Sequence, residues 1–140
     1  MALSVTGDEV EAILRELLPK NGYVLKNNPR KTGETGSDIV AEKNGKIVAI
    51  ECVGFQLNPP LRSKQFYEAF FRAISRLQSG AKECVMALPS RFGNGLNQRA
   101  RQYGIAWDRI AKAFPELRIW LVDTENKRFE DHGWGDWPQL

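Results

Sequence analysis

The sequence has few of the residues on which much catalytic and metal chemistry depends. His132 is the only histidine among 140 residues, and Cys52 and Cys84 are the only cysteines. Both cysteines lie in apolar, strand-like runs, "AIECV" and "ECVMAL", which is typical of reduced core residues. This scarcity argues against a Cys/His or Ser/His catalytic pair and against a zinc site.

Long hydrophobic runs are also missing. No segment approaches the roughly 18 apolar residues of a membrane-spanning helix, and "MALSVTGDEVEAIL" lacks a basic region followed by an apolar stretch. We therefore expect a cytoplasmic protein. The length suits one domain with a real core, so we predict a single domain over residues 1–140, with an acidic, tryptophan-containing tail at 124–140.

Basic residues are concentrated in the middle of the chain. The formal net charge is +3, but residues 60–118 hold eleven basic residues against four acidic ones, a net of +7. Such a segment favours a polyanionic partner, DNA above all, although these side chains could equally be solvated helix faces. Across the whole chain, the candidate nucleic-acid-binding residues are Arg30, Lys31, Arg72, Arg76, Arg99 and Arg101.

Hydrophobic periodicity and turn signals predict the element order αβββαβαβ. A capping box of Thr6 and Glu9 opens the first helix, which ends at Pro19 and Gly22, and "YVLKN" from Tyr23 is typical of a strand. Further on, "LNPP" is expected to interrupt regular structure, and Ser63 to cap a second helix that stops at Ser79-Gly80.

The second half of the chain alternates buried strands with helices. "ECVMALP" and "LRIWLVD" are short apolar runs typical of strands buried on both faces, and we take "LRIWLVD" as the last strand. One or two helices cover "GLNQRARQYGIAWDRIAKAF" between them. Helices between buried strands indicate an α/β fold in which a central mixed sheet is flanked by helices.

A β-hairpin over "GSDIVAEKNGKIVAIECVG" brings two carboxylates together. Asn44-Gly45 is a strong signal for a two-residue type I′ turn, since both central residues need a positive φ. The resulting register pairs Lys43 with Lys46 and, further out, Asp38 with Glu51. Like charges opposed at about 5 Å repel by about 3 kcal/mol at an effective dielectric near 20.

That repulsion needs compensation, and two explanations stay open. Oxygen ligands of this kind suit Mg²⁺ or Mn²⁺, so the pair could hold a metal ion. Alternatively, Asp38 caps a loop and Glu51 binds an arginine.

An acid at the end of one strand, the hairpin and "IEC" at the end of the next, followed by a helix and a buried strand, resemble the PD-(D/E)XK nuclease superfamily, which has the restriction-endonuclease-like fold. The resemblance spans roughly Asp8 to Val122, and "VEAILRELLPKNGY" looks like the first helix of restriction-endonuclease-like and Holliday-junction-resolvase-like members. It implies that Asp38, Glu51 and the backbone carbonyl of Cys52 bind Mg²⁺ or Mn²⁺. It also implies that Glu11 is the helix carboxylate and that the protein forms a homodimer.

The sequence departs from the family at Val53, which stands where the family has a catalytic lysine. Some members recruit the basic residue from another element, and Lys64 is then the nearest candidate; it could equally be an exposed lysine at a helix start. The family often has glutamine near the position of Arg76. We also expect that a lysine at position 53 would be tolerated, because the nearby carboxylates would accept its charge.

Three functions follow from these observations. The first is a Mg²⁺-dependent endonuclease in which Asp38, Glu51, Lys64 and Glu11 are catalytic. The second is a nuclease-fold module that has lost catalysis and binds nucleic acid or a protein partner. The third is a partner-binding domain that uses Trp134 and Trp137, although such tryptophans more often pack on their own domain.

Overall fold

A six-stranded mixed sheet forms the centre of the structure, a computed structural model that describes residues 4–31 and 36–137. The strands are neighbours in chain order, and β3, β4 and β5 are parallel while the outer pairs are antiparallel. Their bounds are β1 Val24–Leu25, β2 Ile39–Lys43, β3 Lys46–Cys52, β4 Glu83–Pro89, β5 Leu117–Asp123 and β6 Arg128–Gly133. The predicted α/β fold with a helix-flanked mixed sheet is confirmed.

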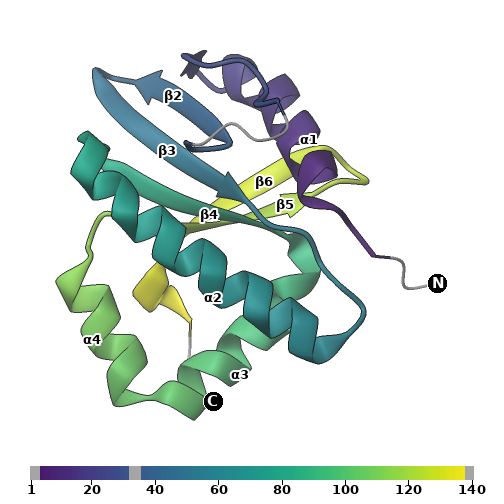
Figure 1. Ribbon diagram of the computed structural model, residues 1–140, viewed down its shortest axis with the longest axis vertical. Coiled ribbons are helices and arrows are strands. Elements are labelled where there is room, and N and C mark those ends of the chain that lie inside the picture. Colours follow the sequence, from purple (N-terminus) through teal and green to yellow (C-terminus); the bar gives the residue numbers. More distant parts are fainter. Residues whose placement is uncertain (1–3, 32–35, 138–140) are drawn as a thin grey trace.

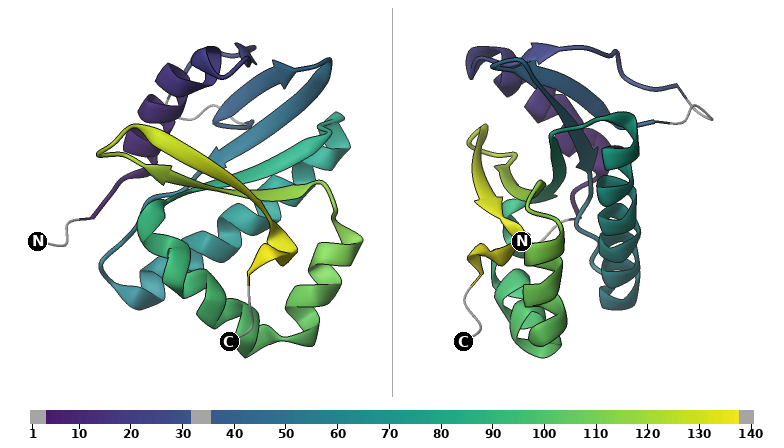
Figure 2. Two further views of the ribbon diagram at one scale, coloured as in Figure 1. Left: turned by 180° about the vertical axis from the view of Figure 1, so that it is seen from behind. Right: turned by 90° about the vertical axis from the view of Figure 1, so that its left-hand side faces the viewer.

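Helices cover both faces of this sheet (Figure 1, Figure 2). Helix α1 (Gly7–Lys20) packs on one face against a cluster that includes Ile50, Val85 and Trp120. The opposite face carries α2 (Pro59–Ser75), α3 (Gly93–Tyr103) and α4 (Ile105–Ala113). No helix in the described part of the chain is long and apolar enough to cross a membrane.

Side chains of successive strand residues alternate between these two faces. On β4, Val85 and Ala87 belong to the α1-side cluster, whereas Met86 and Leu88 belong to the cluster beneath α2 and α3. The core is therefore two apolar layers, one on each side of the sheet, and each strand residue contributes to one of them.

The hairpin has the predicted register. Asn44 and Gly45 both have positive φ, 53° and 77°, as a type I′ turn requires. The ladder runs from the Lys43–Lys46 pair to the Ile39–Ile50 pair. It ends there, one residue before Asp38 and Glu51, so these two carboxylates flank the end of the ladder and do not form a further pair in it.

Helix α2 begins earlier than the sequence indicated. Its N-cap is Asn58, whose side chain accepts a hydrogen bond from the Leu61 N–H at 3.0 Å, and Pro59 is its first residue. The prediction that Ser63 caps this helix is wrong, because proline is well suited to a first helical turn, where no N–H donor is needed. The first helix does begin as predicted, with the Thr6 side chain accepting from the Glu9 N–H, but it continues through Pro19 to Lys20.

The sheet has one more strand than predicted, and its first strand is shorter. β1 covers only Val24–Leu25 of the predicted "YVLKN". The chain continues beyond β5 into β6, which pairs antiparallel with it, so "LRIWLVD" is not the last strand. Part of the predicted tail at 124–140 therefore completes the sheet, while residues 138–140 lie outside the described residues.

Candidate functional site

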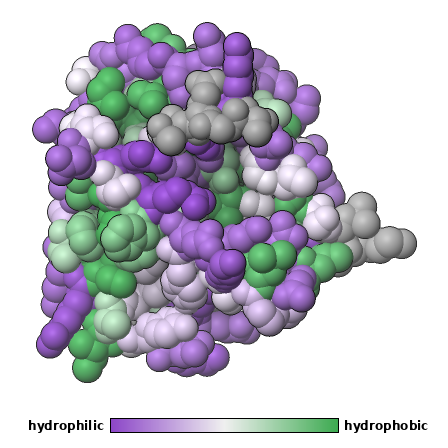
Figure 3. Space-filling view, in the orientation of Figure 1, coloured by the Kyte–Doolittle hydropathy of each residue, from purple (hydrophilic) through white to green (hydrophobic). Residues whose placement is uncertain are grey.

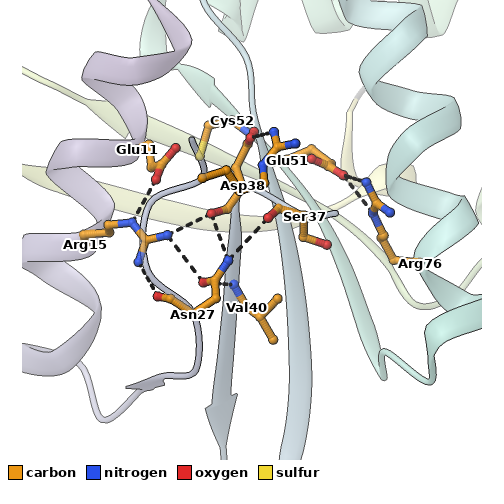
Figure 4. Close-up of polar contacts among 10 residues, drawn as sticks. Glu11, Arg15, Asn27, Ser37, Asp38, Val40, Glu51, Cys52 and Arg76 are labelled. Carbon is orange, nitrogen blue, oxygen red and sulfur yellow. Dashed lines mark hydrogen bonds and ion pairs between the residues drawn. The ribbon is translucent and has the colours of Figure 1, made fainter. Parts of the chain in front are cut away.

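Asp38 and Glu51 lie together where β2 begins and β3 ends (Figure 4). The Oδ2 atom of Asp38 accepts a hydrogen bond from the backbone N–H of Cys52 at 2.8 Å. The side chain of Cys52 packs with the α1-side cluster, whereas Glu51 binds a residue of the α2 side. As expected from strand alternation, the thiol therefore points away from Glu51.

Glu51 is a buried carboxylate bound to an arginine. Its side chain is 2 % exposed, and Nε and Nη2 of Arg76 each lie 2.9 Å from its Oε1. Arg76 follows α2 as the first residue of the 3₁₀ helix Arg76–Ser79. Burial raises the pKa of the Glu51 carboxyl, the nearby Asp38 charge raises it further, and Arg76 only partly offsets these effects, so this pKa is above its ordinary value.

Asp38 is paired with a second arginine. Arg30, in the loop between β1 and β2, donates from Nη2 to Oδ1 of Asp38. This hydrogen bond is the main reason why the pKa of the Arg30 guanidinium is raised. Both carboxylates that the hairpin brings together are thus neutralised by arginines from elsewhere in the chain. The arginine at Glu51 agrees with the second of the two explanations left open by the sequence, whereas that explanation gave Asp38 a loop-capping role and no arginine.

A further polar network on the α1 side holds the loop that carries Asp38. Arg15 of α1 donates from Nε to Glu11 and from Nη2 to the Asp38 carbonyl, both at 2.8 Å. Asn27 donates to the same carbonyl at 3.3 Å and accepts from the Val40 N–H at 2.8 Å. Glu11 therefore lies beside the site as the partner of Arg15, and its proposed catalytic role stays a prediction.

Sequence reasoning missed Arg15 and Asn27 as members of this network. The spacing of Glu11 and Arg15, four residues apart on a helix, did carry a signal for an ion pair. Nothing local in the sequence indicates that Arg15 also reaches the Asp38 carbonyl, because that contact joins residues 23 positions apart.

The structure does not bring Lys64 to the carboxylates. The Lys64 ammonium is 3.9 Å from Glu68 on the same helix, and its side chain is 72 % exposed. Lys64 precedes Arg76 by twelve residues, which corresponds to about 18 Å along a helix. The proposal that Lys64 replaces the motif lysine is therefore not supported. The cation that reaches Glu51 from this part of the chain is Arg76, directly after α2.

Val53 occupies the motif-lysine position as a core residue. It is 4 % exposed and belongs to the cluster that contains Phe66 and Phe92. This packing argues against the expectation that lysine would be tolerated there, because an ammonium group would replace an apolar side chain in a packed layer.

The other candidate nucleic-acid contacts are distributed over the α2 and α3 side. Arg72 is half exposed and lies 3.9 Å from Glu68, Arg101 is exposed on α3, and Lys31 is exposed beside the Asp38 loop. Arg99 lies against the rings of Phe66 and Phe92. Over α2 the surface mixes hydrophilic and apolar side chains (Figure 3), so the basic residues are interspersed rather than continuous.

The tryptophans of the C-terminal segment pack on their own domain. Trp134 is buried and stacks on Trp107, with ring centroids 3.9 Å apart. Each indole N–H of this pair donates to the backbone carbonyl of the other residue, at 2.9 and 3.1 Å. Trp137 lies against the same cluster. These two residues thus pack on their own domain, as tryptophans more often do, and partner binding through them stays a prediction.

The donor set in this arrangement does not fit a divalent metal ion. Among the described residues, no group of three or more His, Cys, Asp or Glu side chains is placed to hold one. The charges of Asp38 and Glu51 are balanced by Arg30 and Arg76, so Mg²⁺, which is bound through carboxylate oxygens, would have to displace both arginines. The start of α1 also approaches the Cys52 carbonyl, since a Cβ at Gly7 would lie 2.9 Å from that oxygen.

Two solved structures share this fold, although no family model and no curated protein sequence matches the chain. An XisH family protein from Nostoc punctiforme PCC 73102 has a TM-score of 0.58 and 18% identity, covering 90% of this chain and 99% of its own. An fdxN element excision controlling factor protein from Anabaena variabilis has a TM-score of 0.56 and 17% identity, covering 88% and 96%. At these identities the similarity establishes the fold alone.

Proposed function

We propose that this chain is a nucleic-acid-binding module built on a nuclease-like fold, with a carboxylate site that does not hydrolyse phosphodiesters. One observation carries the proposal: Arg30 and Arg76 bind the two carboxylates that would otherwise be metal ligands. Without a metal ion, the site has no means of lowering the pKa of an attacking water. Val53, which stands where the nuclease superfamily has a catalytic lysine, is buried and uncharged, so this position supplies no cation either.

Charge and fold support nucleic acid as the partner. Residues 60–118 carry a net charge of +7, and basic side chains release counterions when they neutralise phosphates. One of the two structural neighbours is an excision controlling factor protein of the fdxN element. A role in binding DNA agrees with both observations, and DNA is the partner that we propose.

Duplex binding measured by fluorescence anisotropy at several salt concentrations tests this function. The logarithm of the association constant should fall linearly with the logarithm of salt concentration, with about one unit of slope per phosphate contact. Arg101→Gln should weaken binding equally for unrelated sequences, because phosphate contacts carry no sequence information. Binding that is insensitive to salt, or absent at low salt, would contradict the proposal.

A second candidate, a Mg²⁺- or Mn²⁺-dependent endonuclease, is favoured by one observation. Asp38 and Glu51 flank the end of one ladder, and the Cys52 backbone lies between them. With both arginines displaced, Asp38, Glu51 and the Cys52 carbonyl are the groups that would hold the ion. Cleavage of plasmid DNA that needs metal and is lost in Asp38→Ala would establish this candidate in place of the first.

A further inference from the structure

A polar pocket opens at the carboxyl ends of β3 and β4, and neither Asp38 nor Glu51 is among the residues that line it. Its volume is about 380 Å³, within the usual range for small-ligand sites. It is bounded by Phe55 after β3, by the start of α2, and by the segment after β4 that leads into α3. In open α/β sheets, ligands bind outside the carboxyl ends of parallel strands.

Three arginines line this pocket. The guanidinium carbons of Arg62 and Arg91 lie 4.4 and 4.2 Å from the centroid of the same Phe55 ring, so both cations flank this ring. Arg99 lies 4.9 Å from the Phe66 ring. None of the described residues lining the pocket is Asp or Glu. The lining therefore carries positive charge that attracts anions, and Arg91 also borders the neighbouring pocket, which Glu9, Asp123 and Glu125 line.

The position of Arg99 is built into the fold. Its Nη2 donates to the Ser63 hydroxyl at 3.3 Å. Its Nη1 lies close to Gly95, because a Cβ at that position would be 2.8 Å from this nitrogen, so alanine there would displace the end of the Arg99 side chain. These contacts preorganise the Arg99 guanidinium, so that less conformational entropy is lost when a ligand binds.

The start of α3 adds a favourable dipole on the same wall. Asn94 and Gly95, in its first turn, line the pocket. Within the described chain no side chain caps this helix start, and its first turn has no acidic residue. Backbone N–H groups at a helix start favour anions, and phosphate in particular. Here the 3₁₀ turn Ser90–Phe92 runs directly into α3, and the Gly93 N–H already donates to the Ser90 carbonyl.

We propose that this pocket binds a terminal phosphate monoester of a nucleic-acid strand, held by Arg62, Arg91 and Arg99. The inference deepens the proposed function and rests on it. A terminal monoester carries nearly two negative charges near pH 7, more than a diester within a strand. Arginine suits it because its planar fork of donors matches phosphate oxygens, and a concave site admits a strand end more readily than a continuous strand.

Two tyrosines form the wall of the pocket beside α2 and α3. Tyr67 and Tyr103 pack edge to face, with centroids 6.0 Å apart. Burial, together with its hydrogen bond to Tyr103, raises the pKa of Tyr67 to about 12, so this phenol stays neutral at neutral pH and does not repel a phosphate. Aromatic side chains at such a wall also offer a surface on which a terminal base can stack.

The test compares duplexes of one sequence that end in a 5′-phosphate, a 3′-phosphate or only hydroxyl groups. Fluorescence anisotropy with an internal label should show at least about tenfold tighter binding of a phosphorylated form by the wild type. Arg99→Gln and Gly95→Ala should both remove that preference, Gly95→Ala without changing the charge. Arg109→Gln, which removes one exposed charge on α4, should keep it.

The outcomes separate the inference from the proposed function. Equal affinity for all three duplexes would overturn the phosphate pocket and leave general DNA binding intact. A preference that survives in both Arg99→Gln and Gly95→Ala would also overturn it. Absence of binding to every duplex at low salt would overturn the proposed function together with the inference. If Arg99→Gln fails to fold, as judged by circular dichroism, Arg62→Gln takes its place.

Discussion

Arg76 contacts the buried carboxylate of Glu51 through two nitrogens, Nε and Nη2, each 2.9 Å from the same oxygen, Oε1. The resemblance to nucleases placed a metal ion at this carboxylate and a lysine two residues further along the strand. The structure has an arginine from beyond α2 and a valine instead. A site that was predicted to collect cations from solution is neutralised by cations of the chain itself.

Removal of Arg76 should destabilise the fold. Arg76→Gln leaves Glu51 as a buried carboxylate without its main partner, and we expect a loss of at least about 2 kcal/mol in the free energy of unfolding. Urea denaturation followed by circular dichroism measures it. Arg72→Gln removes a half-exposed charge from the last turn of α2, one turn before Arg76, and should cost less than about 0.5 kcal/mol. Equal losses in both variants would mean that the Glu51 contact contributes nothing specific.

The stability of the fold should depend on the proton of Glu51. Its pKa is raised above the ordinary value of 4.5, chiefly by burial, so the folded chain holds this proton more tightly than the unfolded chain. As the pH rises from about 4 through the folded-state pKa, this group therefore lowers the free energy of unfolding. Relative to Glu51→Gln, the wild type should lose stability over that interval, as measured by urea denaturation. A relative gain would show that Arg76 outweighs burial.

Restoring the motif lysine should not be tolerated. Val53 lies in the apolar layer with Phe66 and Phe92, so Val53→Lys places an ammonium group among core side chains. We expect a loss of about 2 to 4 kcal/mol in thermal or urea unfolding. Val53→Met adds length without charge and should be at least about 2 kcal/mol more stable than the lysine variant. Wild-type stability in Val53→Lys would show that the ammonium reaches the carboxylates.

Trp134 should behave as a core residue although it lies in the segment predicted as a tail. Trp134→Ala removes the stack on Trp107 and the hydrogen bond that the Trp134 indole N–H donates to the Trp107 carbonyl, so we expect a cost of about 3 to 5 kcal/mol. Phe71→Ala, which removes a side chain that is 69% exposed, is the matched control and should change stability by less than about 0.5 kcal/mol. Comparable effects in a thermal denaturation series would contradict this packing.

The parts of the fold that the sequence predicted correctly depend on local signals. Asn44-Gly45 determines the turn and therefore the register of the hairpin. Because side chains alternate between the two faces of a sheet, that register also determines which side chains lie on the same face. The α/β class follows from helices that separate buried strands. Strand β6 was missed because its sequence, "RFEDHG", is polar. It lies at the edge of the sheet, and an edge strand can form without the alternation of apolar and polar residues by which strands are recognised in a sequence.

The electrostatics of the site could not be predicted, because its contacts join distant parts of the chain. Arg76 meets Glu51 across 25 residues, and the sequence showed only that an arginine was a possible partner. Lys64 was favoured as the nearest cation in sequence, yet helical rise carries it about 18 Å from Arg76. Proximity along the chain was a poor guide once a helix intervened.

Uptake of Mn²⁺, followed through the electron paramagnetic resonance signal of the free ion, tests the central claim most directly. If Arg30 and Arg76 neutralise Asp38 and Glu51 as the structure shows, the free Mn²⁺ signal at sub-millimolar concentration should be the same with the wild type as with Asp38→Ala. Uptake of one ion per chain by the wild type, lost in Asp38→Ala, would contradict the account and restore the metal-dependent nuclease.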